Sequence, residues 1–393
     1  MAERLKILVL NQISANGLRR LPAEAYVVGK DIAAPDAVLL RSADMHGMDI
    51  PASVQAIGRA GAGTNNIPVP ALSARGVPVF NAPGANANAV KELVIAGMLL
   101  AARNLPSALR FVDGLDAAAA DLDKVVEDGK KAFAGVELQG QTLGIVGLGK
   151  IGCLVADAAI RLGMQVLGYD PEITVDAAWS LPSQVRRATS VAEVLRASDF
   201  VTLHVPLVAA TRHLVNADNI GSMRAGAVLL NFSREGVVDD AAVLNALSAK
   251  ALGHYVCDFP SAALHRLPGV IALPHLGAST REAEENCAIM VVDQLRDYLE
   301  HGNVVNAVNF PQVAMPREAA YRVAIANANV PNMLGQISTA MAQAGLNIHN
   351  MVNKSRGEMA YTLVDVDSAV GADVLDSLRR IEGVLSVRYL PQG

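Results

Sequence analysis

The chain has 393 residues, which at roughly 100–200 residues per domain predicts several domains rather than one compact core. Hydrophobic residues make up 52% of it and charged residues 18%, a balance that excludes global disorder. The net charge of −5 and the aromatic content of 4% argue against nucleic-acid binding through a basic groove and base stacking.

Cysteine usage and the N-terminus bear on the compartment. Cys153, Cys257 and Cys287 lie far apart and form no CxxC pair, so we expect a reducing cytoplasm. The N-terminus is polar and runs directly into a strand-like stretch at residues 5–10, without the apolar segment of a signal peptide. The sequence has no apolar run of about 18 residues, so no membrane span is expected.

The first hundred residues alternate between short apolar runs and helical patterns. A long helix is expected at 86–103, and a polar helical stretch without an assigned function at 115–133. Strands that alternate with helices indicate βαβ units and a mostly parallel sheet. Four strands are expected here, at residues 5–10, 37–40, 54–57 and 77–80.

A second block with the same alternation begins at residue 141. Six strands with interleaved helices are typical of one doubly wound sheet, and a long amphipathic helix at 282–301 follows them. A proline-containing linker is expected at 305–315. The six strands are expected at residues 143–146, 165–169, 200–204, 227–231, 255–258 and 269–273.

The last block, residues 319–393, has the order β-α-β-β-α-β, which is the ferredoxin-like order. The sequence therefore predicts an α/β protein with two doubly wound, Rossmann-like parallel sheets and a small C-terminal ferredoxin-like domain. The elements of the last block are expected at residues 321–327, 333–344, 347–353, 359–366, 372–381 and 384–390.

Residues 147–152 read Gly-Leu-Gly-Lys-Ile-Gly, a GxGxxG pattern between an apolar strand and a helix. Gly147 permits a tight turn, Gly149 lets backbone approach a pyrophosphate, and Gly152 lets the helix pack on the strand. Asp170 ends the next strand, where its carboxylate would accept both ribose hydroxyls and repel a 2′-phosphate. The pattern therefore favours NAD over NADP; a glycine-rich turn beside an incidental acid is the alternative. The GxxxxGK[ST] spacing of an ATP-binding loop is absent.

Three polar segments follow predicted strands of the second block, where ligands of doubly wound sheets bind. They begin at residues 231, 257 and 274 and contain an arginine, Arg234, and a histidine, His275. Beside NAD, this pair suggests carboxylate binding and proton transfer, which oxidation of a 2-hydroxy acid requires. Taken singly, each residue is more often structural. No metal site is predicted.

Six segments together are highly specific: GRAGAG at 58–63, NAPGANAN at 81–88, GIVGLGKIG at 144–152, LHVPL at 203–207, NFSR at 231–234 and PHLGAST at 274–280. Through them the chain resembles, over essentially its whole length, the D-isomer-specific 2-hydroxyacid dehydrogenases. Within that family it is similar to the phosphoglycerate-oxidising branch with a C-terminal ACT domain. The resemblance implies a substrate domain at 1–98 and 283–316, an NAD domain at 99–282 and an ACT domain at 319–393.

The resemblance also implies roles for single residues. Arg234 would bind the substrate carboxylate and polarise the C2 oxygen, and His275 would be the acid/base. Arg41 would meet a substrate phosphate, with Arg59 as a weaker candidate. The backbone of Gly61, Ala62 and Gly63 would hold the carboxylate. The implied cofactor contacts are Gly147, Gly149, Lys150, Ile151, Gly152, Asp170, Phe232, Ser233, Arg234, Asp258, His275, Gly277 and Ala278.

The sequence departs from the family where a glutamate should orient the histidine. Ala262 stands at that position, and Cys257 takes the usual Asp place, with Asp258 after it. Loss of this carboxylate should lower the histidine pKa and remove a tautomer lock. Our hypothesis is that Glu235 or Asp258 replaces it; the alternative is that Glu235 is solvated and the enzyme works without a dyad.

The ACT-like block implies a small-ligand sensor. In serine-inhibited relatives the matching positions bind serine across a dimer interface, and here they carry Asn329 and Asn347, with Asn327 where a relative has His. The alternative is a domain that only pairs subunits, and a homodimer or homotetramer is expected in either case. The implied reaction is NAD-dependent oxidation of 3-phospho-D-glycerate to 3-phosphooxypyruvate, the first step of serine synthesis. Two alternatives remain: a dehydrogenase of another D-2-hydroxy acid, and a weakly catalytic NAD(H)-sensing regulator.

Overall fold

The computed structural model describes residues 4–116 and 121–392, and its contacts divide the chain into two compact units. Unit 1 is Met1–Asn86 with Arg281–Gly393, and unit 2 is Ala87–Thr280. By this contact criterion helix α3 (Ala87–Ala102) belongs wholly to unit 2, where it packs on α6 and β10. The C-terminal block lies within unit 1 by the same criterion.

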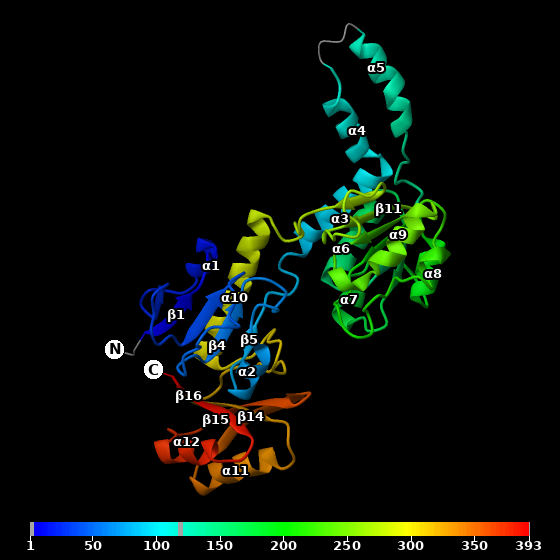
Figure 1. Ribbon diagram of the computed structural model, residues 1–393. Coiled ribbons are helices and arrows are strands. Elements are labelled where there is room, and N and C mark those ends of the chain that lie inside the picture. Colours follow the sequence, from blue (N-terminus) through cyan, green and yellow to red (C-terminus); the bar gives the residue numbers. More distant parts are fainter. Residues whose placement is uncertain (1–3, 117–120, 393) are drawn as a thin grey trace. The chain divides into compact units, whose positions relative to one another are not determined.

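Unit 1 begins with a parallel five-stranded sheet in the order β2-β1-β3-β4-β5 (Figure 1). Helix α10 returns to this sheet after unit 2 and packs on α1 and β4 through buried Ala288, Val291 and Leu295. Sequence analysis did not predict β2, a four-residue strand at the edge of the sheet. The elements are β1 (Leu5–Val9), α1 (Ala15–Leu18), β2 (Tyr26–Gly29), β3 (Ala37–Leu40), β4 (Ala56–Arg59), α2 (Val69–Ala74), β5 (Val79–Phe80) and α10 (Arg281–His301).

Unit 2 is a doubly wound parallel sheet in the order β12-β11-β10-β9-β6-β7-β8. Successive strand residues face opposite sides. Ile145 and Leu230 therefore join the core under α3 and α6, while Val146 and Leu229 join the core under α8 and α9. The elements are β6 (Thr142–Val146), α6 (Lys150–Arg161), β7 (Gln165–Tyr169), α7 (Val175–Ser180), β8 (Arg186–Arg187), α8 (Val191–Ala197), β9 (Phe200–Leu203), η2 (Ile220–Ser222), β10 (Ala227–Asn231), η3 (Glu235–Val237), α9 (Asp240–Ser248), β11 (Leu252–Cys257) and β12 (Val270–Ala272).

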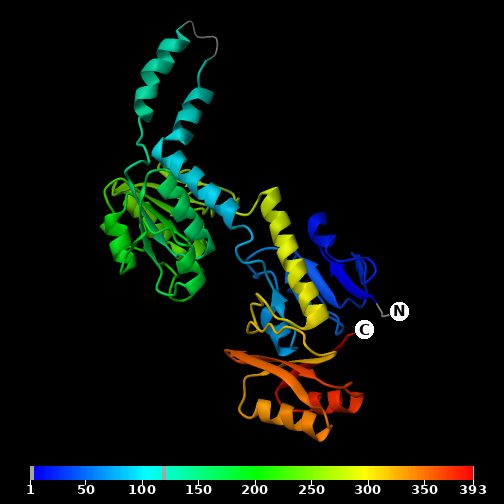
Figure 2. The same cartoon turned by 180° about the vertical axis from the view of Figure 1, so that it is seen from behind.

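A helical hairpin extends away from the sheet of unit 2 (Figures 1 and 2). It consists of α4 (Leu105–Asp113), α5 (Leu122–Gly129) and the 3₁₀ turn η1 (Lys130–Phe133). No residue of these elements is buried, and Leu109 and Val112 are 62% and 58% exposed. The single helix expected at 115–133 is thus α5 followed by a 3₁₀ turn, and its residues 117–120 lie outside the described residues.

The C-terminal block is an antiparallel sheet in the order β14-β15-β13-β16 with two helices, so the expected ferredoxin-like order is confirmed. Val323 and Ile325 face the helices, whereas Ala324 and Ala326 face the core of the five-stranded sheet domain. The elements are β13 (Tyr321–Ala328), α11 (Met333–Gln343), β14 (Ile348–Arg356), β15 (Met359–Val366), α12 (Ala372–Arg379) and β16 (Val384–Pro391).

Side chains around this block satisfy the last carbonyls of α10, which an α-helix cannot pair internally. Arg388 donates to the carbonyls of residues 298 and 299 at 2.9 and 3.0 Å, and its guanidinium lies 4.3 Å from the Tyr298 ring centroid. Arg322 and Tyr361 donate to the carbonyls of residues 301 and 302 at 3.0 and 2.8 Å. Cations at a helix C-terminus also offset its dipole. Through these hydrogen bonds α10 and the C-terminal block form one continuous structure.

Within the described residues, no single helix has the length and apolarity to cross a membrane. Helices α3 and α4 meet the length and composition criteria only as a pair bent by 67°.

Candidate active site

The glycine loop after β6 has the geometry of a dinucleotide site. Gly147 has φ +94°, and a Cβ there would lie 2.5 Å from the His204 carbonyl oxygen. A Cβ on Gly152 would lie 2.1 Å from the Gly147 oxygen, whereas a Cβ on Gly149 would meet nothing within 4 Å. The first and third glycines are therefore required by packing, and the second faces open space over the N-terminus of α6, where free amides bind phosphate.

Asp170 directly follows β7, beside this loop. Its carboxylate accepts from the amides of Leu148 and Glu172 at 2.8 and 2.9 Å, which fixes its orientation. A pocket of about 480 Å³ lies against it, which is within the size range of small-molecule sites. Lys150 is exposed at the start of α6, and Ile151 packs on the core. The pocket is lined by Leu148, Gly168, Tyr169, Asp170, Pro171, Ile173, Leu181, Val185, Arg187, Ala188 and Thr189.

The turn that carries Arg234 is held by Asn231, a fully buried residue at the end of β10. Its side-chain oxygen accepts from the amide and hydroxyl of Ser233 at 3.1 and 2.8 Å, and its NH₂ donates to the Arg234 carbonyl at 2.9 Å. The Phe232 side chain is buried in the core against Gly97. The sequence alone did not indicate this role of Asn231. The feature that could have indicated it is a polar residue at the end of an otherwise apolar strand.

Asp258 holds the loop of His275. It is 2% exposed, and its two oxygens accept from the amides of Leu276 and Gly277, both at 2.7 Å. His275 itself has φ +57°, and its ring lies edge-on to Phe259 with centroids 5.1 Å apart. No hydrogen bond in the described part of the chain joins the His275 ring to Glu235 or Asp258. Asp258 thus acts on the backbone of the loop and not on the imidazole.

Two buried groups near these strand ends are electrostatically silent at neutral pH. Burial lowers the pKa of His204 to about 3, so its ring, which contacts the Thr202 hydroxyl at 3.0 Å, is neutral. Burial raises the pKa of the Cys257 thiol to about 11, so the residue in the usual Asp place is an uncharged thiol. The three cysteines are buried and free.

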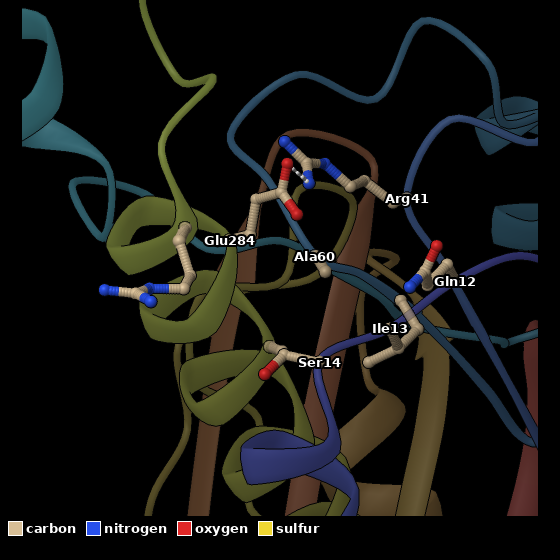
Figure 3. A pocket seen from close by; sticks show the side chains of 8 residues that line it. Gln12, Ile13, Ser14, Arg41, Ala60 and Glu284 are labelled. Atoms are coloured by element: carbon tan, nitrogen blue, oxygen red, sulfur yellow. Dashed lines mark ion pairs between the residues drawn. The ribbon is translucent and has the colours of Figure 1, made fainter.

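Unit 1 has a polar pocket of about 160 Å³ at the carboxyl ends of β1, β3 and β4 (Figure 3). In the order 2-1-3-4-5 the strand order reverses between β1 and β3, which is where ligands of such sheets bind. Arg41 reaches into it and forms an ion pair with Glu284 of α10. The pocket is lined by Gln12, Ile13, Ser14, Arg41, Ala60, Arg281, Glu284 and Ala288.

The glycine loop after β4 adjoins Arg59, whose guanidinium would lie 2.2 Å from a Cβ on Gly61. The Gly61 carbonyl accepts from the amide of Ala82 at 2.9 Å, and the Asn81 side chain donates to the Ala62 carbonyl at 2.5 Å. Within the described residues the amides of Ala62 and Gly63 donate to no protein acceptor. The Gly61 amide, by contrast, donates to the Arg59 carbonyl at 2.8 Å, so the amides of Ala62 and Gly63 are the two in this loop that an anion could engage.

The three asparagines of the C-terminal block differ in environment. Asn327 is 1% exposed on β13, and its side-chain oxygen has no hydrogen-bond partner in the part of the chain described. The Asn329 side chain donates to the Gly357 carbonyl at 3.0 Å, and Asn347 is exposed before β14. A cluster of His, Cys, Asp and Glu able to hold a metal is absent from residues 4–116 and 121–392.

Comparison with known proteins agrees with this geometry. Residues 95–277 match the NAD binding domain of D-isomer specific 2-hydroxyacid dehydrogenases. D-3-phosphoglycerate dehydrogenase of Haemophilus influenzae is 33% identical over 340 residues, which cover 84% of this chain and 79% of the relative. The enzyme of the same name from Escherichia coli is 33% identical over 341 residues, with the same coverage.

Among solved structures, the TT0316 protein of Thermus thermophilus superposes with a TM-score of 0.63 at 27% identity, over 77% of this chain and 100% of that one. The expected α/β fold class is confirmed. The glycine loop, the acid after β7 and the His275 turn belong to a recognisable dehydrogenase domain. The chain is thus an NAD-dependent member of the D-isomer-specific 2-hydroxyacid dehydrogenase family.

Proposed function

We propose that the protein oxidises 3-phospho-D-glycerate to 3-phosphooxypyruvate with NAD, the first step of L-serine synthesis. The observation that carries the choice of a phosphorylated substrate is Arg41, an arginine in a polar pocket at the switch point of the unit 1 sheet. The names of the two relatives above support the same substrate. In this assignment residues 1–98 and 283–316 bind substrate, 99–282 bind NAD and 319–393 regulate.

NAD, when bound, accepts the hydride that leaves C2 of the hydroxy acid. The His275 imidazole takes the proton of the 2-hydroxyl, and its loop stays in place because Asp258 holds two backbone amides. The Arg234 guanidinium binds the carboxylate and polarises the C2 oxygen. The free amides of Ala62 and Gly63 add donors for a carboxylate.

The test measures NADH formation by the full chain with 3-phospho-D-glycerate and with unphosphorylated D-glycerate. We expect turnover of the phosphorylated substrate and a loss of about 100- to 10,000-fold in His275→Gln, as for a general acid/base. His265→Gln, at an exposed position of the same unit, is the matched control. Turnover of only unphosphorylated acids favours the second dehydrogenase hypothesis. NADH binding without turnover favours the regulator hypothesis.

We propose further that L-serine inhibits through the C-terminal block. The unpaired side-chain oxygen of buried Asn327 supports a ligand there, because a buried acceptor without a partner carries a cost that an ammonium group removes. Helix α10 supports transmission of the effect of serine from the C-terminal block to the pocket of unit 1. Its C-terminal end is bonded to the block, and its first turn carries Glu284, which lines that pocket. Asn347→Ala should raise the serine concentration for half-inhibition, and Gln343→Ala, an exposed amide on α11, should leave it unchanged.

A homo-oligomer is also part of the proposal. The hairpin of α4 and α5 supports it, because exposed apolar residues on a projecting element are costly in water unless a partner covers them. The buried free cysteines are compatible with a reducing cytoplasm. Sedimentation of the full chain distinguishes dimer, tetramer and monomer.

A further inference from the structure

The pocket of unit 1 is lined by a carboxylate of the protein itself. Glu284, in the first turn of α10, pairs with the Arg41 guanidinium, and Figure 3 shows the two side chains facing each other across the pocket. Their side chains are 28% and 49% exposed, with Glu284 the more exposed of the two. A phosphate that binds Arg41 therefore meets a carboxylate that holds the same guanidinium.

The two partners differ in how firmly they are fixed. The backbone of Arg41 is anchored by its amide, which donates to Asn11 at 2.8 Å, and by its carbonyl, which accepts from Arg59 and Asn66 at 3.0 and 3.3 Å. Glu284 is half exposed, and its ion pair with Arg41 is the side-chain interaction found for it in the described residues. A ligand that displaces Glu284 from Arg41 therefore moves the Glu284 side chain toward solvent, while the backbone of Arg41 stays in place.

We propose that Glu284 is a specificity-determining residue that competes with the substrate phosphate for Arg41. The identity of the substrate rests on the proposed function, whereas the competition concerns any phosphate-bearing ligand of this pocket. A phosphate dianion offers three oxygens and two charges to a guanidinium and displaces a single carboxylate. A neutral hydroxyl at the same place does not, so an unphosphorylated acid leaves the Arg41–Glu284 pair intact.

Glu284→Gln removes the charge and retains the shape. An exposed ion pair contributes about 0.2–1 kcal/mol, so removing the competitor should tighten phosphate binding by about 1.4- to 5-fold. Asp293→Asn is the matched control, because it removes one negative charge from the same helix at an exposed ion pair with Arg20. Arg41→Met removes the phosphate ligand itself.

Two readouts on the full chain separate the inference from the proposed function. The first is the thermal midpoint against added inorganic phosphate, compared with potassium chloride at equal ionic strength, which yields an apparent Kd without turnover. The second is KM for 3-phospho-D-glycerate and for D-glycerate. Glu284→Gln should lower the phosphate Kd and the phosphoglycerate KM, leave the glycerate KM unchanged, and differ from Asp293→Asn.

A higher or unchanged phosphate Kd in Glu284→Gln overturns the proposal, since the carboxylate would then position Arg41 or be irrelevant to it. The same holds if phosphate stabilises no variant, or stabilises Arg41→Met as well as the parent. A tighter phosphate Kd without phosphoglycerate turnover keeps the competition and overturns the proposed substrate.

Discussion

Arg322 offers the sharpest stability prediction, because all its donors are used inside the protein. It is 0% exposed and forms a bidentate ion pair with Asp365 at 2.6 and 2.9 Å. It also donates to the carbonyls of His301, Met315 and Pro316 at 3.0, 3.0 and 2.9 Å. One side chain thus joins β13, β15, the end of α10 and the linker.

Arg322→Met leaves the Asp365 carboxylate buried without its ion-pair partner, with the Glu318 amide at 3.4 Å as its remaining donor, which costs about 3–5 kcal/mol. Arg322→Met with Asp365→Leu removes the uncompensated charge, so most of this loss should return. The remaining deficit should be about 1–3 kcal/mol, from carbonyls that lose their donor. Arg379→Met, in an exposed pair with Asp376, should cost less than about 1 kcal/mol.

Native-state hydrogen exchange of the full chain, read by mass spectrometry, measures this locally. Amides of β13 and β15 should exchange about 100-fold or more faster in Arg322→Met, since about 1.4 kcal/mol is a factor of ten. Amides of β6 and β10 in unit 2 serve as the internal control. Protection of β13 and β15 within about threefold of the parent, where about 3–5 kcal/mol is expected, would refute the reasoning.

Three further predictions concern unit 2. Gly149→Ala should leave the thermal midpoint unchanged and weaken NAD binding in titration, because the added Cβ meets no protein atom but stands where the pyrophosphate approaches. Gly152→Ala should lower the free energy of unfolding by about 1–3 kcal/mol in urea, because its Cβ would lie 2.1 Å from the Gly147 oxygen. Asp258→Asn should lower kcat about tenfold or more with stable NADH binding, since hydrogen bonds to a charged group contribute about 1.5–3 kcal/mol; an unchanged kcat would contradict this. Burial lowers the pKa of His204 from 6.5 to about 3, so below pH 6.5 the unfolded chain takes up a proton that the folded chain does not, and the free energy of unfolding falls. Between pH 7 and pH 5 this loss of stability is about 2 kcal/mol. His204→Gln should reduce the loss, as measured by urea unfolding at the two pH values.

The sequence was sufficient for features that depend on a few consecutive residues. The turn at Gly147 and the close packing at Gly152 within α6 could be read from it, because the left-handed φ and the missing Cβ are local requirements. The order of the C-terminal block followed from alternating periodicity. Short edge strands such as β8 (Arg186–Arg187) were missed, because a pair of exposed arginines carries no apolar pattern.

Tertiary structure alone decided which distant side chains meet. Arg41 and Glu284 lie far apart in the sequence, and they pair because α10 returns to the first sheet after unit 2. Arg322 and Arg388 look like ordinary strand residues in the sequence, yet they complete the end of α10. In the sequence Asp258 is one residue of a segment expected to line the cofactor, and only the structure shows that its carboxylate holds the His275 loop. Local patterns report what the backbone of a segment prefers, whereas side-chain partners depend on how the segments pack, and that packing is a property of the whole chain.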